Sequence, residues 1–99
     1  MQNVNLVVLS GEIHSVSPGA DHVNIFIRVS NVSKGKDGSK IYRKENIMVV
    51  MEDPGTILQY LVRGKYVIVQ GCLSSTGYGE AGNTYVLAKS VTFNGARHD

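Results

Sequence analysis

Hydrophobic residues recur at every second position in two stretches of the first half of the chain. Between residues 23 and 29 every odd position is Val or Ile, and mostly polar residues fall between them. The same period returns between residues 47 and 51. Successive side chains point to opposite faces of a strand, so each stretch predicts a strand with one buried face. The eight residues SKGKDGSK, Ser33–Lys40, predict the loop of a long antiparallel hairpin that spans Val23–Met51.

Three further strands are expected outside this hairpin. Val4–His14 is apolar on both faces as far as Gly11, which predicts a bulge or bend. A connection, Ser15–His22, contains the turn dipeptide Pro18-Gly19. The last two strands are expected at residues 65–75 and 85–93. Their inward residues are expected to be Val67, Val69 and Leu73 in the first, and Leu87 and Val91 in the second.

One short α-helix is expected between the third and fourth strands. Asp53 would be its N-cap and Pro54 its first residue, where a missing N–H costs nothing. Gly64 would end the helix after about two and a half turns, with Ile57, Leu58 and Leu61 on one face. Five strands with one helix in this place predict an all-β, five-stranded Greek-key OB-fold barrel. We expect a single domain at residues 1–95 and a polar tail at 96–99.

The composition narrows the class of protein. The chain has 99 residues, 42% hydrophobic and 18% charged, which is typical of one small globular domain. No apolar run approaches the roughly 20 residues of a membrane span, and the first residues do not resemble a signal peptide. The single cysteine, Cys72, cannot form an internal disulfide, which fits a reducing compartment. These features predict a cytoplasmic protein that does not bind membranes.

No arrangement of residues predicts catalysis or a metal site. His14, His22 and His98 have no His or Cys partner at zinc spacing, and the acidic residues do not accompany a nucleophile in a known motif. The residues 77–82 match G-x-G-x-x-G but precede a strand, whereas a nucleotide site needs a strand before them and a helix after. We therefore expect no enzyme activity, no cofactor and no metal.

The positive charge is concentrated in the hairpin. Five of the ten Lys and Arg residues lie between Lys34 and Lys44, with one acid, Asp37, in that span. Aromatic residues on the face opposite the core would stack on bases while the cations hold phosphates. A solvated loop is the alternative interpretation. The candidate nucleic-acid-binding residues are Phe26, Arg28, Lys34, Lys36, Lys40, Tyr42, Arg43, Lys44 and Tyr78.

Several stretches carry a resemblance to a known family. NVNLVVLSGEI, VNIFIRVSN, ENIMVVM, LQYLVRGKYVIVQGCL and TYVLAKSVTF resemble the strands and helix of the bacterial single-stranded DNA-binding protein family, including its short PriB-type primosomal relative. The most specific segment, YLVRGKYVIVQGCL, resembles the family pattern Y-L-x-K-G-x-x-V-x-I-x-G-x-L. By position, a family aromatic falls on Tyr78, and two tryptophan positions fall near Ser33 and Asn46. The chain has no Trp, so it departs from the family there.

Together these features predict sequence-nonspecific binding of single-stranded DNA in replication, recombination or replication restart. Single-stranded RNA fits the same pattern, and the alternative is an OB-fold module that binds a protein and no DNA. The resemblance implies other replication proteins as partners and a bacterial, phage or plasmid origin. The doubly apolar first strand predicts a homodimer or homotetramer. The expected interface residues are Val4, Leu6, Val7, Val8 and Leu9.

Overall fold

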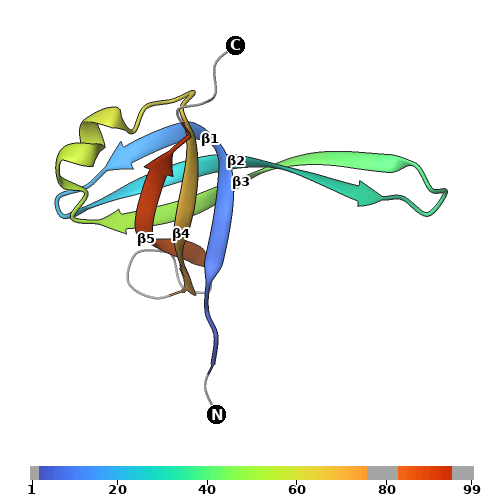
Figure 1. The fold of residues 1–99 in the computed structure, drawn as a ribbon, viewed down its shortest axis with the longest axis horizontal. Helices are drawn as coiled ribbons and strands as arrows, with labels where there is room; N and C mark the ends of the chain where they lie inside the picture. The colour runs from blue at the N-terminus through green and yellow to red at the C-terminus, as the bar shows by residue number, and fades with distance from the viewer. Residues whose placement is uncertain (1–2, 76–82, 95–99) are drawn as a thin grey trace.

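A computed structural model describes residues 3–75 and 83–94 of the chain. Five strands form a closed barrel in the order β1-β2-β3-β5-β4, which is the predicted OB fold (Figure 1). A single helical segment, η1, lies between β3 and β4 in the described residues. The strands and the segment are β1 (Val7–Pro18), β2 (His22–Lys34), β3 (Lys40–Glu52), η1 (Gly55–Tyr60), β4 (Tyr66–Ser74) and β5 (Tyr85–Phe93).

Strand β1 closes the barrel because it pairs with a different neighbour along each half. Its first half, Val7–Glu12, is antiparallel to β4, and its second half, from Glu12 to Pro18, is antiparallel to β2. A Cβ on Gly11 would collide with the carbonyl oxygen of Arg28, so the strands approach too closely there for a larger residue. The bulge itself lies at His14, three residues later than Gly11. The strand also continues to Pro18, through most of the predicted connection.

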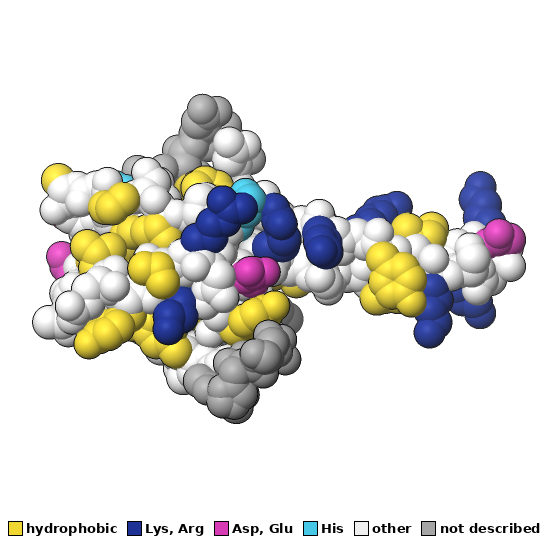
Figure 2. Space-filling model, turned by 90° about the horizontal axis from the view of Figure 1, so that it is seen from above, with side chains coloured by type: hydrophobic (Ala, Val, Ile, Leu, Met, Phe, Trp, Pro, Cys, Tyr) yellow, Lys and Arg dark blue, Asp and Glu magenta, His cyan; other side chains and the backbone are white. Residues whose placement is uncertain are grey.

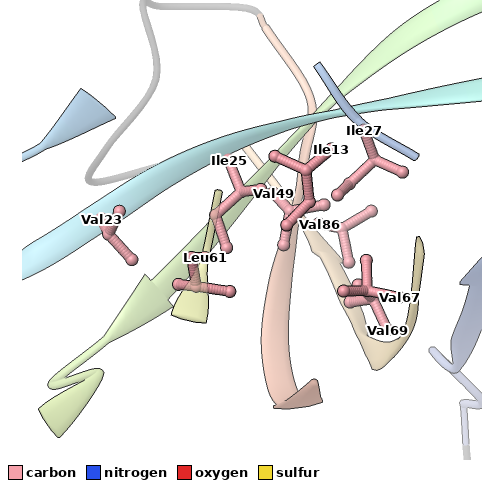
Figure 3. Packing of buried hydrophobic residues seen from close by; sticks show 9 residues of the cluster. All are labelled: Ile13, Val23, Ile25, Ile27, Val49, Leu61, Val67, Val69 and Val86. Atoms are coloured by element: carbon pink, nitrogen blue, oxygen red, sulfur yellow. The ribbon is translucent and has the colours of Figure 1, made fainter. Parts of the chain in front are cut away.

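The core contains the odd-numbered face of β2 that the alternation predicts. Val23, Ile25 and Ile27 of β2 are fully buried, as is Val49 of β3. Figure 3 shows these side chains converging inside the barrel with residues from β1, β4 and β5. The complete cluster is Ile13, Val23, Ile25, Ile27, Val49, Leu61, Val67, Val69 and Val86.

Two predicted inward residues are wrong. Leu73 is 50% exposed, and Leu87 lies outside the core cluster, where Val86 takes its place. The ladder between β4 and β5 shifts register after the pair of Gln70 and Ser90, because Gly71 pairs with Ala88. The extra residue, Lys89, lies in β5 and reverses which side chains of that strand face the core, so Val86 replaces Leu87. Leu73 keeps the alternation of Val69 and Gly71 but lies near the end of β4, where its side chain is exposed. Val67, Val69 and Val91 precede the shift and face inward as predicted.

The helix is shorter and tighter than predicted. It is a six-residue 3₁₀ helix that ends at Tyr60, and its N-cap is Pro54 and not the expected Asp53. Asp53 instead has a φ of 48°, which lies outside the β region that an N-cap residue adopts. Leu61 follows the helix and is buried in the core cluster, so it anchors the connection to β4.

Candidate nucleic-acid interface

The outer half of the β2–β3 hairpin projects from the barrel as a two-stranded arm, Ser30–Lys44 (Figure 1). The two strands stay paired without a break from His22 opposite Glu52 to Lys34 opposite Lys40. The side chains of the arm are exposed, whereas those of the inner half of β2 alternate between buried and half-buried. The predicted hairpin is therefore confirmed, and its loop is shorter than the eight residues expected.

The turn at the tip is built by residues 35–39. The Gly38 N–H donates to the Gly35 carbonyl oxygen at 3.0 Å, and Gly38 has a φ of 86°, a conformation that glycine adopts without strain. The Asp37 carboxylate accepts hydrogen bonds from the backbone N–H and the hydroxyl of Ser39, at 3.0 and 2.6 Å. A type I turn followed by a left-handed glycine is a common short hairpin connection. Sequence and geometry agree here, so the strand ends are held in register.

Strand alternation places most of the candidate residues on one face of the hairpin. This outer face, opposite the core face, continues from the barrel to the tip of the arm. It consists of Phe26, Arg28, Ser30, Val32 and Lys34 of β2, facing Met48, Asn46, Lys44, Tyr42 and Lys40 of β3. At about 3.4 Å per residue, the distance along the strand from Phe26 to Lys34 is roughly 27 Å.

Three candidates are not part of this face. Arg43 alternates with Tyr42 and Lys44, so it lies on the opposite face, with Ile41 and Glu45. Lys36 lies in the turn beyond the ladder. Tyr78 lies outside the described residues, as does the glycine-rich segment around it.

The cations of the arm have no acidic partner among the described residues. Within residues 3–75 and 83–94, the ion pair found is that of His22 with Asp21, far along β2 from the arm. Lys34 and Lys40 lie directly opposite each other, and like charges in this position destabilise a ladder. Figure 2 shows lysine and arginine side chains following the arm from the barrel to its tip. Such a row of unpaired cations can bind an anionic chain that neutralises them.

Arg28 is held in place where the arm leaves the barrel. Its Nη2 lies 3.0 Å from Nδ1 of His14, the bulge residue of β1, and its Nε donates to the Asn46 side-chain oxygen at 3.5 Å. Arg28 is half-buried, unlike the lysines of the arm. Its guanidinium is therefore a fixed positive charge, whereas the lysines are long exposed side chains.

A cavity of about 330 Å³ lies at the root of the arm. Register places Tyr66 of β4 beside Glu12 of β1, and Glu12 beside Arg28 of β2. These three residues line the cavity together with Lys44 of the arm. The remaining lining residues are Ser10, Gly11, Ser30, Val67 and Asn94. The cavity thus joins the outer face of the barrel to the outer face of the arm.

Glu12 and Tyr66 are absent from the sequence-based candidates. Outward alternation could have indicated that each is exposed. Their meeting depends on the register of β1 against β4, which no local pattern reveals. Tyr60 and Tyr85 contribute to the barrel instead: Tyr85 is 2% exposed, and the Tyr60 ring lies edge-to-face with Phe93 at 6.4 Å.

The predicted interface residues divide between two faces. Val7 and Leu9 pack against the core, whereas Val4, Leu6 and Val8 are 89%, 69% and 57% exposed. Asn5 fixes the segment before β1, because its side chain donates to the Leu73 carbonyl oxygen and accepts from the Leu73 N–H. Three exposed apolar residues therefore lie at alternate positions of a segment held against β4.

Two exposed carboxyl groups have lowered pKa values. The Ser39 hydroxyl and N–H lower the pKa of Asp37 by hydrogen bonding to its charged form, and His22 lowers that of Asp21 in the same way. Within the described ranges, no three His, Cys, Asp or Glu side chains gather as a metal ion requires. Nor does any helix of these ranges have the length and apolar character to span a membrane.

Solved structures with similar folds include proteins named for single-stranded DNA binding. That of Plasmodium falciparum, in complex with single-stranded DNA, gives a TM-score of 0.74 at 16% identity over 94% of this chain and 96% of that one. A small single-stranded DNA-binding protein from Streptomyces coelicolor gives a TM-score of 0.73 at 15% identity over 100% of both chains. PriB from Ralstonia solanacearum gives a TM-score of 0.70 at 11% identity over 93% of this chain and 99% of that one. These likenesses establish the fold. No family model and no curated protein sequence matches the chain.

Proposed function

We propose that the protein binds single-stranded DNA with little sequence preference, through the outer face of its hairpin arm. The observation that carries the proposal is the alignment of Arg28, Lys44 and the Lys34–Lys40 pair with Tyr42 on one face. Residues 3–75 and 83–94 contain no acidic partner for these cations. The three similar structures are of proteins named for single-stranded DNA binding or as PriB, which supports the same conclusion.

Two kinds of contact would act together on this face. Cations neutralise phosphates and release condensed counterions, which gives affinity without sequence preference. Tyr42 is 72% exposed and offers its ring to a base, and stacking accepts any base because every base has a flat aromatic face. Phe26 is half-buried beside Met48 and offers less of its ring. A duplex hides its bases in the stack, so the arm should prefer single strands.

We infer that the protein is a binding protein of the cytoplasm and not an enzyme, because the arm offers phosphate and base contacts but no nucleophile beside a general base. We also propose that a second copy covers Val4, Leu6 and Val8. These exposed apolar residues lie next to the half-exposed Leu73, and a patch of this kind is typical of a protein–protein interface. A homodimer is the simplest assembly that covers it.

Binding of a labelled oligo-dT should be compared with binding of a matched duplex and of single-stranded RNA, at about 50 and 200 mM salt. We expect oligo-dT to bind more tightly than the duplex and to weaken as the salt rises. The RNA result decides whether the face distinguishes the two single strands. Equal affinity for oligo-dT and the duplex would mean that nonspecific charge attraction alone explains the binding. No binding to any nucleic acid would favour the alternative, a module that binds a protein.

A further inference from the structure

The cavity at the root of the arm contains a carboxylate in a surface otherwise suited to phosphate. Glu12 is half-buried on β1, and it makes no hydrogen bond or ion pair with any described residue. Its cross-strand neighbour Arg28 is engaged by His14 and Asn46 instead. A general phosphate track gains nothing from a negative charge at this point, so the carboxylate needs another explanation.

Register gives this carboxylate defined neighbours. Tyr66, Glu12 and Arg28 form a row across three adjacent strands, and Asn46 continues the row on β3. Adjacent strands lie about 4.8 Å apart, so a ring, a carboxylate and a guanidinium follow each other at that spacing. The cavity volume of about 330 Å³ lies at the lower end of the range for small-ligand pockets. A single nucleotide fits a site of this size and chemistry.

We propose that this cavity receives one nucleotide of the bound strand and favours guanine, which Glu12 recognises through its Watson–Crick edge. The inference rests on the proposed function and adds a preference at one position of an otherwise nonspecific track. Arg28 and Lys44 hold the flanking phosphates, and Tyr66 lines the wall of the cavity against the base.

The chemistry of the base edges decides between the four bases. An ionised carboxylate only accepts hydrogen bonds, and its two oxygens can accept from two adjacent donors. Guanine offers N1–H and the N2 amino group side by side. Cytosine and adenine each offer one amino group next to an acceptor nitrogen. Thymine places a carbonyl oxygen on either side of its single N–H, so these oxygens would repel the carboxylate.

The test uses oligo-dT of about 16 nucleotides, the upper end of the footprint of one OB fold, with no guanine or with one central guanine. A single guanine avoids folded guanine-rich structures. A third oligonucleotide carries hypoxanthine at that position, which keeps N1–H and lacks the N2 amino group. Affinity is measured for the parent protein and for Glu12→Gln. The control Glu45→Gln makes the same charge change on the opposite face, where the Glu45 carboxylate accepts from Asn31.

We expect one guanine to raise the affinity of the parent protein at least 5-fold, because a bidentate pair discriminates by about 1–3 kcal/mol. Hypoxanthine should lose most of this gain. Glu12→Gln should bind oligo-dT at least as tightly as the parent and lose the preference, whereas Glu45→Gln should keep it. Equal affinity of the parent for oligonucleotides with and without guanine would overturn this inference and leave the proposed function intact. A preference that survives in Glu12→Gln would also overturn it. Failure of the parent to bind oligo-dT would overturn the proposed function and this inference together.

Discussion

The assignment of cations to the two faces of the arm makes a prediction that net charge alone does not make. Arg43 and Lys44 are neighbours in the sequence and both are exposed, yet they lie on opposite faces of the ladder. Lys44 shares the outer face with Arg28 and Tyr42 and lines the cavity, whereas Arg43 faces away beside Asn31. Arg43→Ala and Lys44→Ala each remove one positive charge, and they remove it from opposite faces.

The expected change in the salt dependence of binding follows from counterion release. Each phosphate contact on a single strand contributes about −0.7 to the slope of log affinity against log salt. Lys44→Ala should therefore flatten the slope by about 0.7, and Arg43→Ala should leave it nearly unchanged. Between about 50 and 200 mM salt, one such contact changes the ratio of parent to variant affinity by roughly 2.6-fold.

The assay is fluorescence anisotropy of a labelled oligo-dT, titrated with each variant at several salt concentrations. Thermal unfolding of both variants serves as the control for folding. Equal slopes for Arg43→Ala and Lys44→Ala would refute the face assignment, because binding would then respond only to total charge. If both variants kept the slope of the parent, the arm would not be the site of phosphate contact.

Three further predictions concern other parts of the surface. Tyr42→Ala should weaken oligo-dT binding about 5- to 150-fold with an unchanged salt slope, since a stack contributes about 1–3 kcal/mol per base and releases no counterion; Ile41→Ala on the opposite face is the matched control, and equal losses in both would contradict stacking. In sedimentation at tens of micromolar the parent should be a dimer and Leu6→Asp a monomer, and a monomeric parent would exclude the proposed interface. The tip turn should loosen as the pH falls through the pKa of Asp37, which is lowered below its ordinary 3.8, because the charged carboxylate that Ser39 binds is lost there. The NMR chemical shift of the Ser39 amide should follow this change, and Asp37→Asn should abolish the pH dependence.

Local patterns predicted the features of this protein that depend on neighbours in the sequence. Alternation between residues 23 and 29 identified the buried face of β2. A slip of one residue would turn all of these apolar side chains to solvent, so only one register buries them. The same alternation identified the outward direction of Tyr42 and Lys44. The place of the hairpin loop was predicted at Ser33–Lys40, and the structure shortens it to a turn around Gly38.

Features that depend on pairing between distant strands were not predictable in this way. Leu87 continues the alternation of its strand, and only the extra residue of β5 at the register shift turns it away from the core. The row of Tyr66, Glu12 and Arg28 requires β1 to change partners at Glu12, where it leaves β4 and joins β2. Asp53 was predicted as the helix N-cap, but its φ of 48° lies outside the β region that an N-cap residue adopts, and Pro54 takes that position.

Repulsion between cations of the arm destabilises the free protein, and this repulsion favours anion binding. Lys34 and Lys40 face each other at its end, and the exposed ladder beyond Val29 buries little apolar surface to offset their repulsion. The Asp37–Ser39 hydrogen bonds and the Gly38 turn nevertheless keep the two strands closed. The backbone that carries the cations is therefore ordered before a ligand arrives, and less ordering entropy is lost on binding. A phosphate chain that neutralises them relieves the repulsion, so binding and the stability of the arm reinforce each other.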